Sequence, residues 1–173
     1  ATLTLERGNR FRSNNGSTSP YTFVVLEPMT SPKNSSNQYV FSGVIAKQGV
    51  LKRMLYLVDN SIQNQKFVIP DDNVDTSTLR VRVKTNQDSD DYESYSKFTT
   101  LSGITATSLV YFIQENASGK FEVYFGDSIL GKKPINNNIV EIEYIYTSGE
   151  EANNLRTFTS LDNVGGLTQV SAT

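Results

Sequence analysis

Two neighbouring stretches are the most informative part of this chain: Gly119-Lys-Phe-Glu-Val-Tyr-Phe-Gly-Asp-Ser-Ile-Leu-Gly-Lys-Lys-Pro134 and, after a short polar link, Asn138-Ile-Val-Glu-Ile-Glu-Tyr-Ile-Tyr146. Apolar and polar side chains alternate over residues 121–125 and again over 139–146. Alternation with a period of two is typical of a β-strand that buries one face. We therefore predict two strands here, arranged as a hairpin around the loop that joins them.

The loop between these predicted strands is built on Phe125, Gly126, Asp127 and Gly131. Glycine adopts positive φ angles where a Cβ would clash, and an aspartate side chain can close an Asx turn on its own backbone. We expect these four residues to fix the shape of the loop. They form a structural signature turn and not a binding site.

The rest of the chain also has a β pattern. Further β-branched and aromatic runs predict strands at residues 21–26, 39–45, 50–58, 66–85 and 108–114, the last of them a central strand. Gln48-Gly49 suggests a hairpin turn between two of these runs, and a short helical turn is expected near Tyr92. The predicted fold class is mainly β, with antiparallel sheets in a sandwich or barrel-like form, long loops and at most short helices.

The domain organisation is inferred from the point at which the alternating strand pattern ends. We expect a β-rich structural domain over residues 1–147, in which a break near 60–75 would define two subdomains. Residues 148–173 are polar, with only scattered apolar side chains, and predict a tail that packs on a partner or stays mobile. Because the strand pattern has already begun at Ala1, we expect the chain to be a piece of a longer protein.

Composition excludes several classes of function. Sixteen basic and eighteen acidic residues give a net charge of −2, which argues against nucleic-acid binding. No apolar run approaches the roughly 20 residues that span a bilayer, so no membrane partner is expected. The chain has no Cys, His or Trp. It therefore lacks thiol and imidazole catalysis, thiolate or imidazole metal ligands, and the commonest sugar-stacking side chain.

Carboxylates are the remaining candidates for chemistry. Two groups of acidic residues could supply a pair of catalytic carboxylates, as in a glycosidase. The first group is Asp71, Asp72 and Asp75, and the second is Asp88, Asp90, Asp91 and Glu93. Both groups lie in polar turns without an aromatic platform, so we interpret them as solvated loops. If the enzyme hypothesis held, Asp72→Asn or Asp90→Asn would abolish activity.

A calcium loop is a second interpretation of the first acidic group. Asp71, Asn73 and Asp75 occupy the first three ligand positions of such a loop. Thr76 stands where the loop requires glycine, and Arg82 stands where it requires a bidentate glutamate. The loop therefore fails as an EF-hand, and at most a weak calcium site remains. We expect no cofactor.

Asparagines and aromatic residues mark turns and faces. The sequons at Asn15, Asn34 and Asn116 are interpreted as turns. Tyr92 and Tyr95 are candidates for exposed anchors. Within the alternating strands, the core is predicted to contain Phe121, Val123, Phe125 and Ile139, but not Glu141. Tyr124 would lie on an outward stripe that could serve as an interface.

Four stretches also resemble, in the same order, the baseplate J-like family, which supplies the baseplate wedge of contractile phage tails. The main one is Phe125-Gly126-Asp127, a small residue, an aliphatic pair, Gly131-Lys132 and a strand ending in tyrosine; Ser128 stands where many relatives carry glycine. The others are Thr4-Leu-Glu-Arg-Gly-Asn-Arg-Phe11, then 44–49 with Phe67-Val-Ile-Pro70, and Asp75-Thr-Ser-Thr-Leu-Arg-Val-Arg-Val83. The pattern is most similar to the wedge subunits of T-even-type phages.

The resemblance implies a structural component of the virion and no enzyme. Such a subunit would associate with itself as a dimer within a ring around the tail hub, and would hold other wedge and sheath-initiating subunits. It would be assembled in the host cytoplasm, lie in the tail baseplate and rearrange as the sheath contracts. The alternative is a carbohydrate- or receptor-binding β module of a tail fibre or adhesin, which long polar loops and surface tyrosines would serve.

Overall fold

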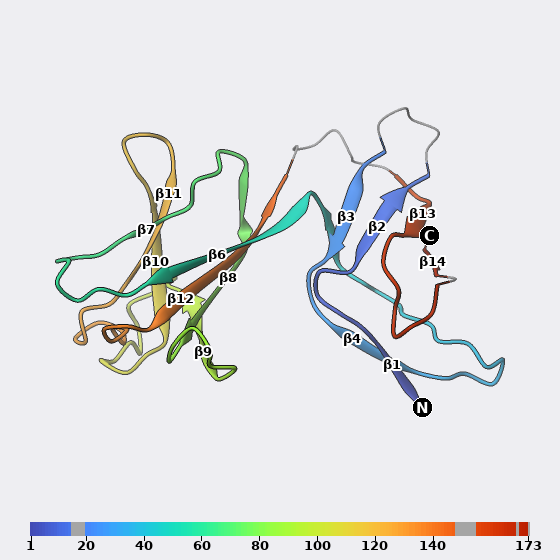
Figure 1. The fold of residues 1–173 in the computed structure, drawn as a ribbon, viewed down its shortest axis with the longest axis horizontal. Helices are drawn as coiled ribbons and strands as arrows, with labels where there is room; N and C mark the ends of the chain where they lie inside the picture. Colours follow the sequence, from blue (N-terminus) through green and yellow to red (C-terminus); the bar gives the residue numbers. More distant parts are fainter. Residues whose placement is uncertain (15–19, 148–154, 169, 173) are drawn as a thin grey trace. The chain divides into compact units, whose positions relative to one another are not determined.

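The computed structural model describes residues 1–14, 20–147, 155–168 and 170–172, and all regular structure within them is β. This confirms the predicted mainly β class. The chain forms two compact units (Figure 1). Unit 1 comprises Ala1–Leu51 and Ile145–Thr173, and unit 2 comprises Lys52–Tyr144. No helix in the described part of the chain is long and apolar enough to cross a membrane.

Unit 2 is built around one seven-stranded sheet with the order β6-β12-β8-β9-β10-β11-β7. Its strands are β6 (Val50–Leu57), β7 (Phe67–Val68), β8 (Val74–Lys84), β9 (Tyr92–Lys97), β10 (Val110–Glu115), β11 (Phe121–Phe125) and β12 (Ile139–Tyr146). The β9–β10 pair is parallel, whereas β8–β9, β10–β11 and β7–β11 are antiparallel. The predicted central strand is β10, between β9 and β11.

The seven-stranded sheet curls until its two terminal strands meet. Tyr56 of β6 donates its hydroxyl hydrogen to the carbonyl oxygen of Val68 in β7, and its ring packs on Phe67 with centroids 5.6 Å apart. The sheet is thus nearly closed, like a barrel, around apolar side chains of alternate positions. The buried core side chains are Val58, Phe67, Ile69, Val81, Val83, Tyr95, Tyr111, Val123, Val140, Ile142 and Tyr144.

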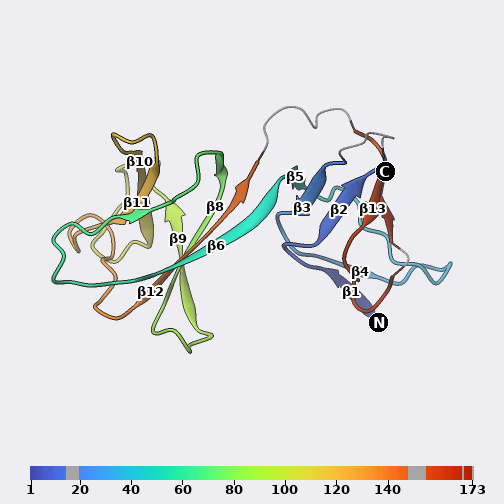
Figure 2. The same ribbon diagram turned by 45° about the horizontal axis from the view of Figure 1, so that its top comes forward.

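Unit 1 contains two smaller sheets (Figures 1 and 2). The first is the antiparallel pair of β1 (Thr2–Leu5) and β4 (Met29–Pro32). The second has the order β14-β13-β2-β3-β5 and consists of β2 (Arg10–Ser13), β3 (Thr22–Val25), β5 (Ala46–Gln48), β13 (Phe158–Ser160) and β14 (Ser171–Ala172). The buried core of unit 1 consists of Leu5, Phe11, Val25 and Val164.

The compact units divide the chain differently from the predicted domains. The expected tail over 148–173 supplies two strands to unit 1, because β13 pairs with β2 and the Phe158 ring packs edge-on against Phe23, with centroids 5.0 Å apart. The unit boundary lies at Leu51 and Tyr144, not near 60–75. Both boundary points fall inside strands, β6 and β12, where no turn signal marks them in the sequence.

Two hairpin predictions are wrong. Strands β11 and β12 have the predicted bounds, but β11 pairs with β10 and β7, whereas β12 lies between β6 and β8. Likewise, β5 pairs with β3 and β6 pairs with β12, so Gly49 joins two sheets instead of turning a hairpin. Alternation reveals a strand's faces but not its neighbours, since pairing between distant segments depends on the whole sheet.

Two local predictions also differ from the structure. Residues 39–45 form no strand beyond an isolated bridge at Tyr39, and Tyr92 begins β9 instead of a helical turn. The run at 39–45 contains Gly43 with φ of +72°, a conformation that interrupts a strand.

Candidate functional site

The predicted signature turn at residues 125–131 is anchored to the core of unit 2. Phe125 ends β11, and its ring packs edge-on against both Phe67 and Tyr95, with centroids 5.8 and 5.0 Å away. A Cβ on Gly126 would lie 2.1 Å from the carbonyl oxygen of Leu130. Glycine is therefore required here for close backbone approach.

Asp127 and Gly131 define the remainder of the turn. One carboxylate oxygen of Asp127 accepts hydrogen bonds from the backbone N–H groups of Ile129 and Leu130, at 2.9 and 3.0 Å, so the expected Asx turn forms. These bonds hold the pKa of Asp127 below its ordinary value. Gly131 has φ of +91° and Ser128 has φ of +70°. Ser128 thus adopts a conformation that glycine would adopt more easily.

A neighbouring loop holds this turn in place. The N–H of Gly131 donates to the carbonyl of Thr105 at 3.0 Å, and the N–H of Lys132 donates to that of Ser108 at 2.8 Å. The ammonium of Lys132 also pairs with Glu93 of β9. These contacts therefore hold the two loops together at this end of unit 2.

The signature turn and the loop bound to it expose large apolar side chains. Leu101 on one loop and Ile129 on the other are strongly exposed, and Leu130 beside Ile129 is about half exposed. We call these three residues the 101/129 surface. Rigid loops that expose apolar side chains are typical of protein contact sites.

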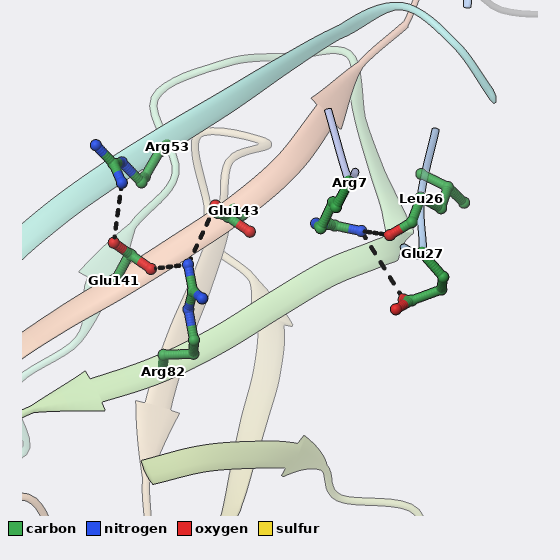
Figure 3. Close-up of polar contacts among 7 residues, drawn as sticks. All are labelled: Arg7, Leu26, Glu27, Arg53, Arg82, Glu141 and Glu143. Carbon is green, nitrogen blue, oxygen red and sulfur yellow. Dashed lines mark hydrogen bonds and ion pairs between the residues drawn. The ribbon is translucent and has the colours of Figure 1, made fainter. Parts of the chain in front are cut away.

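A charged network on β12 was missed by the sequence analysis (Figure 3). Arg82 of β8 forms ion pairs with both Glu141 and Glu143, the latter at 3.2 Å, and Arg53 of β6 approaches Glu141 from the other side at 3.5 Å. The Arg82 guanidinium also lies 4.7 Å from the ring centroid of Tyr92. The sequence analysis excluded Glu141 from the predicted core, but the residue is buried. Burial is possible because Arg82 and Arg53 compensate its charge.

Figure 3 also draws a largely buried arginine of unit 1, Arg7. The guanidinium of Arg7 donates to the carbonyl of Leu26 and lies 3.9 Å from the carboxylate of Glu27. The Arg7 side chain is largely buried, whereas that of Glu27 is exposed. The contact ties the β1–β2 loop to the end of β3.

The acidic residues of the 71–75 group have separate partners. Asp71 accepts hydrogen bonds from Lys52 and from the hydroxyl of Tyr144, and these lower the pKa of Asp71. Asp72 forms an ion pair with Lys120. Within β8, one carboxylate oxygen of Asp75 accepts hydrogen bonds from the backbone N–H and the hydroxyl of Ser77, at 3.0 and 2.6 Å.

The second acidic group lies on the surface. Asp88, Asp90 and Asp91 are exposed, and Glu93 pairs with Lys132. Across residues 1–14, 20–147, 155–168 and 170–172, no three acidic side chains gather as metal ligands would.

The aromatic candidates separate into core and surface. Tyr95 is buried against Phe125 and is no exposed anchor, whereas Tyr92 is about half exposed. Tyr124 stacks on Phe112 with centroids 5.2 Å apart, and Phe112 packs on Phe98 at 4.7 Å. This is the outward cross-strand stripe expected around Tyr124. Phe121 and Phe125 are partly buried in the core, and Val123 and Ile139 are fully buried.

The described sequons form turns, as predicted. The side-chain oxygen of Asn34 accepts from the N–H groups of Ser36 and Gln38, and that of Asn116 accepts from those of Ser118 and Lys120. The Asn116 turn closes the β10–β11 hairpin. Asn15 lies outside the described residues.

Comparison with known proteins identifies the family. A sequence model of the family described as bacteriophage baseplate wedge protein gp6, third domain, matches residues 52–146. The match covers more than half of the 173 residues of the chain. The chain belongs to the gp6 family. The expectation of a baseplate wedge family is thereby confirmed.

The gp6 match coincides closely with unit 2, which spans Lys52–Tyr144. Baseplate wedge protein gp6 of Enterobacteria phage T4 is 28% identical to this chain over 188 aligned residues. The alignment covers 98% of this chain and 27% of the T4 protein, so the chain spans about a quarter of its relative. Both units of the chain are therefore represented in that relative.

Proposed function

We propose that the chain is a structural component of a phage tail baseplate wedge. Membership of the gp6 family, through the whole of unit 2, is the observation that carries this proposal. The geometry of unit 2 suits a rigid assembly part, because its sheet closes on itself and a charged network reinforces β12. We propose no catalytic role, since the candidate acidic residues act as ion-pair partners, local hydrogen-bond acceptors or surface groups.

The 101/129 surface is the contact that we assign to neighbouring wedge subunits. Its apolar side chains lie on loops fixed by backbone hydrogen bonds, so little conformational entropy is lost when a partner covers them. Self-association within a ring around the tail hub, and rearrangement of that ring during sheath contraction, belong to the same proposal. A ring requires repeated contacts between copies, and such contacts require exposed, preformed surfaces.

A pull-down from phage-infected cells tests the proposal. With this chain as bait, we expect other baseplate subunits in fixed ratios, counted by mass spectrometry. Ile129→Asp should abolish recovery of at least one subunit, because burial of the added carboxylate is unfavourable. Ile62→Asp, at another exposed apolar site of unit 2, is the matched control. Recovery unaffected by Ile129→Asp would reject the 101/129 surface, and recovery of no baseplate subunit would reject the wedge role.

The surface stripe of Phe98, Phe112 and Tyr124 favours the second candidate, a carbohydrate- or receptor-binding module. Stacked rings beside the polar groups of Gln114 and Glu122 could hold a sugar ring. Binding of host glycans by the purified chain, lost in Tyr124→Ala, would support this function. We expect no glycan binding if the chain acts only in the wedge.

A further inference from the structure

Unit 1 contains an open cavity, lined mainly by apolar side chains, that no function above uses. Its volume is about 1040 Å³. The walls come from both sheets and from the β4–β5 connection, and include Leu3, Phe11, Phe41, Val44, Phe158 and Val164. Open cavities lined by apolar side chains are typical of binding sites, and a partner can also complete an exposed core in this way.

The neighbouring side chains indicate an unfinished core. Leu5, Phe11, Val25 and Val164 are buried, but Leu3, Phe23, Phe41, Val44, Phe158 and Val170 pack on them while only partly buried. At the mouth, Val40 and Leu167 line the cavity and are nonetheless exposed. Covering these apolar groups would remove their surface from water and favour an apolar occupant.

The charge of the lining restricts the occupant further. Among the described residues that line the cavity, Lys33 is the only charged one. Its ammonium lies 5.6 Å from the ring centroid of Tyr39 and donates to the side-chain oxygen of Asn37 at 2.8 Å. Among the residues that the structure describes, no carboxylate pairs with Lys33. An occupant with an acidic group would match this cation.

A strand beside the cavity determines the conformation of the occupant. Ser171 and Ala172 of β14 line the cavity, and β14 is a terminal strand of the five-stranded sheet. Among the described residues of that sheet, β14 has one neighbouring strand, β13. An extended segment can pair with such an edge and direct alternate side chains into a cavity beside it. Figure 2 shows the β4–β5 connection projecting beyond the sheet before it returns to β5.

We propose that this cavity binds an extended segment of a partner protein that carries apolar side chains and an acidic residue facing Lys33. The segment completes the core of unit 1 and pairs with the edge of β14. The inference rests on the proposed baseplate role, which supplies the partner, but it concerns a different unit from the 101/129 surface. It specifies the chemistry of the partner segment and the residues that hold it.

Site-specific photocrosslinking in assembled phage particles tests the proposal. A photoreactive amino acid replaces Val40 or Leu167, which line the cavity, or the control residues Ile45 or Leu161, which do not. The pairs are matched in exposure, at 58% and 63% for Val40 and Ile45, and at 45% and 46% for Leu167 and Leu161. We expect positions 40 and 167 to crosslink to one apolar, acid-containing segment of another baseplate subunit, identified by mass spectrometry, and the controls not to do so.

Affinity measurements with the crosslinked segment, made as a synthetic peptide, complete the test. Leu167→Asp should weaken binding to the chain about tenfold or more, because it places a carboxylate against the apolar occupant, and Leu161→Asp should not. Lys33→Glu should weaken binding less at high salt than at low salt. Both substituted leucines are partly exposed, so folding is retained and is checked by circular dichroism.

Several outcomes would overturn the proposal. They are crosslinks equal at the control positions, crosslinks only within the same polypeptide, crosslinks to a polar segment, or no crosslink at 40 and 167 in particles that contain the chain. Absence of the chain from purified particles is a different result. It would reject the wedge role itself and the cavity proposal with it.

Discussion

The hydroxyl of Tyr144, a fully buried side chain on β12, donates a hydrogen bond to the carboxylate of Asp71, which also accepts from Lys52. Burial, together with the Asp71 carboxylate, raises the pKa of Tyr144, so the tyrosine stays neutral and acts as a donor. This contact joins β12 of the seven-stranded sheet to the loop before β8. It places an acidic residue that the sequence suggested for catalysis into a structural role.

Tyr144→Phe should lower the free energy of unfolding by about 1.5–3 kcal/mol, the usual range for a hydrogen bond to a charged group. Tyr95→Phe is the matched control, because the buried Tyr95 hydroxyl has no hydrogen-bond partner among the described residues. Removal of that hydroxyl should leave stability unchanged or raise it. Urea unfolding followed by circular dichroism measures both. A Tyr95→Phe loss equal to that of Tyr144→Phe would contradict this explanation.

Asp71 should make stability depend on pH. Lys52 and then Tyr144 hold its pKa below the ordinary 3.8, so the folded state favours the carboxylate. Its contribution is therefore complete above about pH 4–5 and is lost as the pH falls through the folded-state pKa. We expect the acid-side slope of unfolding free energy against pH to be shallower in Asp71→Asn. An unchanged slope would show that other carboxylates control acid unfolding.

Arg82→Met should destabilise unit 2 by about 3–5 kcal/mol, because it leaves the buried Glu141 without its main counter-ion. Arg53 also contacts Glu141, but 60% of its side chain is exposed, compared with 16% for Arg82. Arg53→Met should therefore cost no more than about 1 kcal/mol. The double variant Arg82→Met with Glu141→Gln should recover part of the loss. Thermal and urea unfolding of the set would measure the difference, and equal effects at the two arginines would refute it.

Gly126→Ala should destabilise the signature turn more than Gly103→Ala. At Gly126 the added Cβ would lie 2.1 Å from a backbone oxygen, whereas at Gly103, with φ of +78°, it meets nothing within 4 Å. Gly103→Ala therefore costs only the conformational strain of a positive φ, about 1–2 kcal/mol. Hydrogen exchange at Gly131 and Lys132, whose N–H groups bind the neighbouring loop, would report loosening of the turn. Equal exchange rates in both variants would show that close approach at Gly126 is unimportant.

The sequence was most informative about local structure. Residues 121–125 and 139–146 are strands with the predicted bounds, and Asp127 closes the predicted turn. Side-chain alternation and short-range hydrogen bonding depend on neighbouring residues, so these features can be read from one segment. The predicted faces were also correct for Val123 and Tyr124, one buried and one on the surface stripe.

The candidate site was harder to predict where it depended on pairs distant in the chain. Nothing near Glu141 indicates that Arg82 lies beside it, and nothing near Asp71 indicates Tyr144. The buried state of Tyr95 and of Glu141 likewise follows from which strands become neighbours. A charged residue at an alternating position is expected on the surface unless its partner is known.

From the order of its residues alone, this protein is expected to be built from β-strands, to lack thiol and imidazole chemistry, and to contain a glycine-dependent turn. These properties depend on composition and on short-range geometry. Only the folded chain reveals that β11 and β12 lie apart in the sheet, that residues 158–160 and 171–172 supply strands to unit 1, and that apolar side chains there line an open cavity. Each of these depends on contacts between residues far apart in the chain, because many alternative pairings satisfy the same alternating pattern and only the complete core selects one.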